Sequence, residues 1–407
     1  MPDAKWTFVV YLAGDNNLAE AGETDLDEMR KVGSSNEVNI VAQFDNARNH
    51  GTRRFHVKKD GKNEESTNLG ATDSGSPKVL VDFVDWAVDN YPADRYALVL
   101  WNHGGGWVPS EMDRIARDVG APNYSPTEAV QRSATPLGRT FFRTTLERIF
   151  SMPSIEERAI CSDDGTGHSL DTVELGKVLA KIKTKLGKPL DLLDMDACLM
   201  SNLEVAYQVR PYVSYVVASE ETEPNEGWPY DKVLRQLVDN PDISTADFAR
   251  SIVAAYVKSY RDRGYTDSVT QAALDTSRID TIANALDGLA DALIQQMPTA
   301  ADDIWSALRR SLYFYDKTLW DMSCFSEELA SNGNAAVKAA TKAVNVALKP
   351  ADDGFVISES HSGTRMDRCR GVTIYVPALP EISPYYADLE YAKEHRWLDL
   401  LKAYKGA

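Results

Sequence analysis

The sequence predicts an α/β protein with a mostly parallel sheet that is flanked by helices on both faces. Three runs of strand length are apolar with little alternation: Trp6 to Ala13, Val38 to Phe44 and Tyr96 to Trp101. Strands buried on both faces of a parallel sheet have this near-continuous apolar pattern. Amphipathic segments lie between the runs, as expected for crossover helices that join parallel strands.

The segments between these strands are predicted from turn and helix signals. Gly14 to Asn17 predicts a turn, and Leu18 to Val32 has helical spacing with acidic residues in its early turns. Thr52 to Lys59 predicts an edge hairpin with Asp60-Gly61 as its turn. A helix follows Ser76-Pro77, where apolar residues recur at three- and four-residue steps.

The second half of the chain continues this alternation and then becomes mainly helical. A helix over Asp171 to Lys183 is predicted to begin with Asp171 or Thr172 as its cap. The other predicted elements are strands at Leu190 to Met195, Tyr212 to Ser219, Ser268 to Leu274 and Gly371 to Val376, and helices at Ser201 to Val209, Thr245 to Arg261, Ile279 to Met297 and Ala300 to Tyr315.

We therefore expect three parts in the chain. Residues 1–230 form the α/β core, with an excursion rich in arginine and proline at about 108–158. Residues 231–370 form a mainly helical subdomain with an interspersed strand, and residues 371–407 form a returning strand and a C-terminal helix.

Composition excludes several classes of partner. The net charge of −17, from 44 basic and 61 acidic residues without a basic cluster, makes nucleic acid and anionic membrane poor partners. The sequence contains no run of 18 apolar residues, so no membrane-spanning helix is predicted. The first residues lack a signal-peptide layout, which predicts a cytoplasmic protein, or a secreted one if a leader has been removed. Four widely spaced cysteines without a CxxC pair argue against a zinc site and a disulfide scaffold.

Two strand ends carry residues that are capable of catalysis. The run that begins at Leu190 stops at Cys198, before a helical segment whose N-terminal N–H groups favour a thiolate. The run that begins at Tyr96 ends in His103 and three glycines, which leave room for a ligand. Ligands of open α/β sheets bind beyond the carboxyl ends of the strands. The alternative for Cys198 is an inert buried thiol.

Together these residues are the minimal set for nucleophilic acyl transfer. The imidazole of His103 takes the thiol proton, Cys198 attacks a carbonyl carbon, and the histidine then protonates the leaving amine. The backbone N–H groups of Gly104 and Cys198 are predicted to stabilise the oxyanion.

Six blocks of the sequence resemble the clostripain family of cysteine peptidases, whose clan includes caspases, gingipains and legumain. In order, they are WTFVVYLAGDNNL, YALVLWNHGGGW, ICSDDGTGHSLDTVEL, DMDACLMSNLEVAYQV, ASEETEPNEGWPY and GVTIYVP. The resemblance implies a caspase-like sheet and an endopeptidase that cleaves after Arg or Lys, with His103 and Cys198 as its dyad. Its implied substrates are proteins or peptides that contain these residues.

The basic preference has a counterpart in the acidic residues near the nucleophile. Asp196 lies two residues before Cys198, so strand alternation places both on one side, where the carboxylate can bind a guanidinium or ammonium group. Glu226, on the loop after the next strand, is predicted to form a second wall of this pocket. The alternatives are a structural carboxylate at Asp196 and a solvated loop for the glutamates.

The family resemblance also implies self-cleavage and bears on cofactors. Cleavage between the histidine and cysteine blocks after a basic residue makes Arg114 and Arg117 candidate sites. No cofactor or metal site is predicted as required, and calcium is an optional ion of the family. Two other functions compete with the peptidase: a peptide-binding pseudo-peptidase with little turnover, and a non-proteolytic thiol hydrolase on the same fold.

Overall fold

The computed structural model describes residues 4–15, 18–46, 51–102, 107, 170–224, 226–315, 317–348, 354–377 and 382–406. These residues form a nine-stranded sheet in the order β10-β8-β7-β6-β5-β1-β2-β3-β4 and a small sheet of β11 and β9. The strands are β1 Ala4–Gly14, β2 Val38–Asn46, β3 Gly51–His56, β4 Glu65–Gly70, β5 Ala93–Trp101, β6 Leu190–Asp196, β7 Val213–Ala218, β8 Val269–Asp275, β9 Leu319–Asp321, β10 Val356–Ser362 and β11 Thr373–Tyr375.

The centre of the large sheet is parallel, which confirms the predicted fold class. Strands β7, β6, β5, β1 and β2 run in one direction. The antiparallel pairings lie at the two edges, where β3 and β4 follow β2 on one side and β8 and β10 follow β7 on the other. Successive central strands can be parallel because a helix or a longer excursion joins them.

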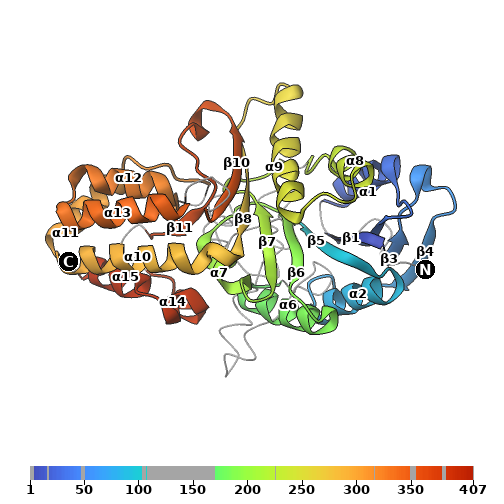
Figure 1. Ribbon diagram of the computed structural model, residues 1–407, viewed down its shortest axis with the longest axis horizontal. Helices are drawn as coiled ribbons and strands as arrows, with labels where there is room; N and C mark the ends of the chain where they lie inside the picture. Colours follow the sequence, from blue (N-terminus) through green and yellow to red (C-terminus); the bar gives the residue numbers. More distant parts are fainter. Residues whose placement is uncertain are drawn as a thin grey trace, which may run out of the picture.

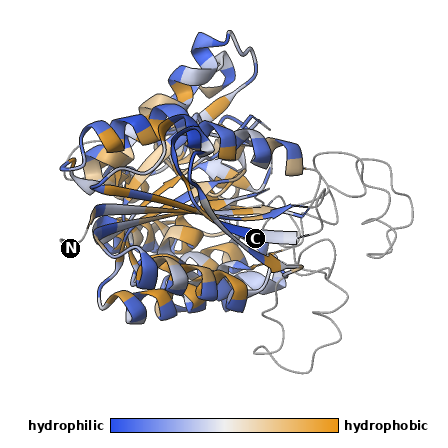
Figure 2. Cartoon of the chain, turned by 90° about the vertical axis from the view of Figure 1, so that its right-hand side faces the viewer, coloured by the Kyte–Doolittle hydropathy of each residue, from blue (hydrophilic) through white to orange (hydrophobic). Residues whose placement is uncertain are grey.

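Helices cover both faces of the sheet (Figure 1). On one face lie α1 Ala19–Val32, α8 Tyr230–Asp239 and α9 Thr245–Asp262, and on the other lie α2 Pro77–Asn90, α6 Thr172–Leu186 and α7 Leu203–Val209. Alternate residues of β1 therefore enter different cores: Phe8 and Val10 pack toward α8 and α9, whereas Val9 and Tyr11 pack toward α2. Figure 2 shows the sheet edge-on between the two helical layers.

The C-terminal helices form a group beside the sheet, visible in orange and red in Figure 1. Helix α10 packs against α13 and α15, and α12 packs against α11 and α13. Their bounds are α10 Ile279–Ile294, α11 Thr299–Leu308, α12 Met322–Asn332, α13 Ala335–Leu348, α14 Glu390–Glu394 and α15 Trp397–Lys405. Short 3₁₀ turns cover Lys59–Gly61, Thr276–Arg278, Thr364–Met366 and Pro384–Asp388. The predicted three-part division of the chain stays a prediction.

Local signals explain where helix α6 begins and ends. Helix α6 begins after Asp171, whose Oδ1 accepts the N–H of Glu174 at 2.7 Å while the Glu174 side chain accepts the N–H of Asp171, a capping box. The helix ends at Gly187, which has the left-handed φ of 70°. Of the two predicted caps, the structure therefore selects Asp171.

Some predicted elements differ from the structure in their pairing or their length. The run from Gly371 to Val376 does not join the large sheet; β11 instead pairs with β9 in the small sheet. The strand that pairs with β8 is β10, whose sequence VISESHS has too many polar residues to predict a strand. The helix predicted over Ala300 to Tyr315 ends at Leu308. None of the described helices is long and apolar enough to cross a membrane.

Candidate active site

The carboxyl ends of β5, β6 and β7 meet at one edge of the sheet. In the parallel register, Trp101 at the end of β5 pairs with Asp196 at the end of β6. Asn102 continues this pairing, since its N–H donates to the carbonyl oxygen of Asp196 at 3.3 Å and its side chain donates to the carbonyl of Ala13 at 2.6 Å. The chain thus leaves β5 directly beside β6. His103 and Gly104 follow Asn102 and lie outside the described residues.

Cys198 lies in the turn between β6 and α7, two residues beyond the end of the strand. It is half-buried, and its Sγ accepts the backbone N–H of Glu223 at 3.2 Å and lies 3.8 Å from the carbonyl oxygen of the same residue. A donor aimed at sulfur favours the thiolate over the thiol. The loop after β7 therefore provides this polar contact to the thiol.

The helix predicted over Ser201 to Val209 is present, but it begins two residues later than predicted and farther from Cys198. Helix α7 begins at Leu203, and its N-terminus is capped by Asn202, whose side chain accepts the N–H of Val205 at 2.9 Å. The segment from Ala197 to Asn202 is a separate turn. Its polar residues Ser201 and Asn202 prefer such turns and caps to the interior of a helix.

The turn around Cys198 is tightly fixed to the loop after β7. Leu199 has φ of 63°, a left-handed conformation that non-glycine residues rarely adopt. Its N–H donates to the carbonyl of Glu221 at 3.2 Å, and the N–H of Ser201 donates to the carbonyl of Ser219 at 2.8 Å. An unfavourable conformation persists where surrounding contacts determine it, and such residues cluster at functional sites.

Asp196 belongs to a group of buried acids. Its Oδ2 accepts the hydroxyl of Tyr230 at 2.9 Å and the N–H of Trp228 at 3.4 Å. Burial raises the pKa of Asp196 to about 6, although these hydrogen bonds and one from the Glu223 side chain favour the charged form. This carboxyl therefore titrates close to neutral pH.

Three further acids surround Asp196: Asp25, Asp194 and Glu223. Asp25 accepts the indole N–H of Trp101 at 2.7 Å, and its pKa is raised well above its ordinary value by burial and by the charge of Asp196. The same two causes raise the pKa of Asp194 and Glu223. Gly227 packs closely against this group, since a Cβ there would lie 3.3 Å from Asp196 Oδ2 and 3.4 Å from Asp25 Oδ2.

Glu223 contacts both the thiol of Cys198 and the neighbouring acids. Its backbone contacts Cys198, while its carboxyl shares a hydrogen bond with Asp196 and accepts the side-chain amide of Gln271 at 3.2 Å. Burial and the charge of Asp196 raise the pKa of Glu223, so the two carboxyls titrate as a pair that shares a proton. Cys198, Glu223 and Asp196 thus form one connected unit.

The other predicted site residues have different positions. Glu226 is exposed on the loop after β7, where its negative charge contributes to raising the pKa of Tyr260 and Tyr265. Arg114 and Arg117, like His103 and Gly104, lie outside the described residues. Sequence reasoning missed Asp25, which comes from helix α1, and it did not distinguish Glu223 from its neighbours. No sequence signal marks Asp25, because only the packing of α1 over β5 brings it to Asp196.

An α/β sheet with a thiol at one strand end and acids beside it is a site for nucleophilic chemistry. A model of the clostripain family matches residues 10–123 and 150–404. The chain therefore belongs to the clostripain family.

Among individual relatives, the chain is similar to clostripain from Hathewaya histolytica. The two are 28% identical over 265 residues, which are 57% of this chain and 42% of the relative. The chain thus matches less than half the length of that clostripain.

Two solved structures share the fold along nearly the whole chain. An inactive zymogen C11 protease from Parabacteroides distasonis has a TM-score of 0.68 at 19% identity, covering 97% of this chain and 98% of that one. A secreted C11 cysteine protease from Bacteroides thetaiotaomicron, in complex with an irreversible peptide inhibitor, has a TM-score of 0.65 at 20% identity, covering 97% and 100%. These similarities establish the arrangement of sheet and helices.

The buried acids should make stability fall as pH rises. Neither carboxylate oxygen of Asp194 has a hydrogen-bond partner among the described residues, and its folded-state pKa is raised well above 3.8. The unfolded chain therefore loses this proton first, and the free energy of unfolding falls above about pH 4, by about 1.4 kcal/mol per pH unit, until the folded pKa is reached. Asp194→Asn should remove this contribution.

Urea unfolding at about pH 5 and pH 7 measures the effect. The decrease between the two pH values should be smaller for Asp194→Asn than for the wild type. Asp239→Asn, at the exposed end of α8, is the matched control and should retain the wild-type decrease. Equal decreases for wild type and Asp194→Asn would contradict this account of the acids.

Proposed function

We propose that the protein is a cysteine endopeptidase that cleaves peptide bonds after arginine or lysine. The observation that carries the proposal is the unit formed by Cys198, Glu223 and Asp196 at the carboxyl edge of the sheet. It places a thiol beside carboxyl groups that a basic side chain can neutralise. Membership of the clostripain family supports the same activity.

The chemistry proceeds in two acyl transfers. The Cys198 thiolate attacks the carbonyl carbon of the scissile bond, and the tetrahedral intermediate collapses with departure of the amine, which takes a proton from the imidazole of His103. A water molecule, deprotonated by the same imidazole, then attacks the thioester and releases the acid and the thiol. The backbone N–H groups of Gly104 and Cys198 stabilise the oxyanion in both steps.

The role of His103 in this scheme is proposed from its place in the sequence, directly after Asn102. Asn102 is hydrogen-bonded to the backbone of β6, and Cys198 follows β6 at the same edge. We therefore propose that His103, the next residue in the sequence, serves Cys198, which follows β6 by two residues. The dyad itself remains our proposal.

In this proposal, the buried acids determine the specificity for the residue before the scissile bond. A guanidinium or ammonium that enters between Asp196 and Glu223 supplies the positive charge that the described pocket residues lack, and it replaces the proton that the two carboxyls share. Glu223 takes the role of second wall in this pocket. Glu226, which is exposed, acts at the rim.

Replacement of the nucleophile tests the reaction class. Cys198→Ala should abolish cleavage of fluorogenic peptides that end in Arg or Lys, because the attacking sulfur is absent. Cys324→Ala, which removes a buried thiol elsewhere in the chain, is the matched control and should retain activity. Cleavage by Cys198→Ala at the control rate would contradict the proposal, and binding without turnover by the wild type would favour the pseudo-peptidase.

The pH dependence tests the pocket separately from the dyad. The ratio of kcat/KM for an arginine peptide to that for its citrulline counterpart cancels the ionisation of His103 and Cys198. Because the pKa of Asp196 is raised to about 6, its charged fraction increases with pH, and this ratio should rise between about pH 5 and pH 7.

Asp196→Asn should lower the same ratio at neutral pH by roughly 30-fold or more, since loss of one partner of a buried charge pair costs about 2 kcal/mol or more. Glu226→Gln should change it only a few-fold, because rim charges are screened by solvent. A ratio that is independent of pH, or unchanged in Asp196→Asn, would refute the assignment of the pocket.

We also propose that the chain cleaves itself after Arg114 or Arg117, between the histidine and cysteine blocks. Mass spectrometry of purified protein should find fragments that end at one of these residues, and Cys198→Ala should remain intact. Full activity of an uncleaved wild-type chain would show that processing is not required. Calcium use and the cytoplasmic location stay predictions from the sequence.

A further inference from the structure

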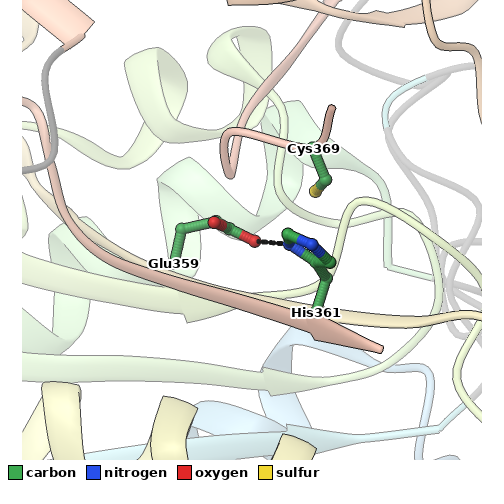
Figure 3. A group of neighbouring side chains, drawn as sticks. All are labelled: Glu359, His361 and Cys369. Carbon is green, nitrogen blue, oxygen red and sulfur yellow. Dashed lines mark hydrogen bonds and ion pairs between the residues drawn. The ribbon is translucent and has the colours of Figure 1, made fainter. Parts of the chain in front are cut away.

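A second group of chemically reactive side chains lies next to the loop after β7. The thiol of Cys369 is the centre of two sets of potential ligands, one with Glu359 and His361 and the other with Glu220 and Asp321. Within each set the ligand atoms lie within 4.8 Å of one another. Figure 3 shows Glu359 and His361 on β10 with the sulfur of Cys369 facing them.

Strand alternation brings Glu359 and His361 to one face of β10. His361 Nδ1 lies 2.6 Å from Glu359 Oε1. Metal-bound histidines in proteins commonly donate one ring N–H to a carboxylate, which fixes the ring and leaves the other nitrogen for the metal. The contact with Glu359 holds the ring of His361 in this way, which leaves Nε2 for a metal.

Glu220 supplies independent evidence for a cation. Its side chain is 1% exposed, its Oε2 lies 2.6 Å from Cys369 Sγ and accepts the N–H of Gly371 at 2.8 Å. Its Oε1 is buried without a hydrogen-bond partner among the described residues. An unsatisfied buried carboxylate oxygen is costly, and a bound cation would satisfy it.

The other described charged groups around the site do not pair with Oε1 of Glu220. Asp321 is already used by the backbone, because its two oxygens accept the N–H groups of Cys324 at 2.7 Å and Arg370 at 2.6 Å. The guanidinium of Arg370 donates to the carbonyl oxygens of Asp367 and Cys369. Arg365 pairs with Glu221 at 2.8 Å.

We propose that Cys369 binds a zinc ion together with His361 from the first set and Glu220 from the second, with Glu359 orienting the imidazole. Because His361 and Glu220 belong to different sets, their side chains move toward the sulfur when the metal binds. Thiolate, imidazole and carboxylate are the ligand types of zinc in proteins, whereas calcium takes oxygen ligands only. On binding, the thiol of Cys369 loses its proton to solvent and the sulfur forms the bond to the metal. No atom changes oxidation state.

The site would link three segments that are distant in the sequence. Glu220 lies near the start of the loop that carries Glu223, His361 lies near the end of β10, and Cys369 lies on the segment before β11. Zinc would therefore stabilise the attachment of this loop to the outer strands of the sheet. Because none of the ligands belongs to the proposed dyad or pocket, the proposal is independent of peptidase activity.

Cobalt(II) as a spectroscopic probe tests the site directly. The protein used should carry Cys161→Ala and Cys198→Ala, so that Cys369 and Cys324 are its only thiols. Titration of this metal-free protein with Co²⁺ should give the near-ultraviolet band of a thiolate–cobalt bond, saturate at one equivalent, and lose the band when Zn²⁺ is added. Absence of this band would overturn the proposal.

Matched variants assign the ligands. In the same background, Cys369→Ser should abolish the thiolate band, and Cys324→Ser should retain it. His361→Gln, at a half-buried position that tolerates substitution, should weaken Zn²⁺ binding by roughly 100-fold or more, and Glu359→Gln by about 10- to 100-fold.

Thermal unfolding provides a readout that does not depend on the spectrum. Zn²⁺ should raise the Tm of the background protein, and Ca²⁺ at the same concentration should not. The Zn²⁺ shift should vanish in Cys369→Ser. A Zn²⁺ shift that persists in Cys369→Ser, or a cobalt band that is lost in Cys324→Ser instead, would refute the assigned site.

Discussion

The parallel register of β5, β6 and β7 is the constraint on which the candidate active site depends. It brings Trp101 and Asp196 side by side and ends the strands at one edge of the sheet. Beyond this edge the backbone is irregular, so its polar groups need partners, and the turn around Cys198 finds them on the loop after β7. The same hydrogen bonds that complete the backbone therefore fix the thiol beside Glu223.

Burial of several acids at this edge is a destabilising feature that the fold retains. Asp25, Asp194, Asp196 and Glu223 all have raised pKa values because burial disfavours their charged forms. Tyr230, Trp101 and Trp228 stabilise part of the group by donating hydrogen bonds. A group of acids without a described cation is suited to a ligand that brings one, as a basic side chain of a substrate does.

The loop after β7 connects the two sites. Its first acid, Glu220, contacts Cys369 in the proposed zinc site, whereas Glu223 contacts Cys198 and Asp196. Glu221 lies between them and pairs with Arg365. Four glutamates that look equivalent in the sequence thus have four different environments, because each side chain leaves the loop in a different direction.

The sequence by itself determined the parallel core, the positions of its strands and the two strand ends that carry Cys198 and His103. These features depend on local apolar patterns and on residues next to strand ends, which are readable along the chain. The tertiary structure alone decided that Asp25 joins Asp196, that Glu223 rather than Glu226 lies beside it, and that β10 replaces the predicted late strand in the large sheet. Cysteine spacing also gave no sign of the cluster at Cys369. Its ligands come from segments that meet only when β8 and β10 close the edge of the sheet, and no local pattern records a contact between distant segments.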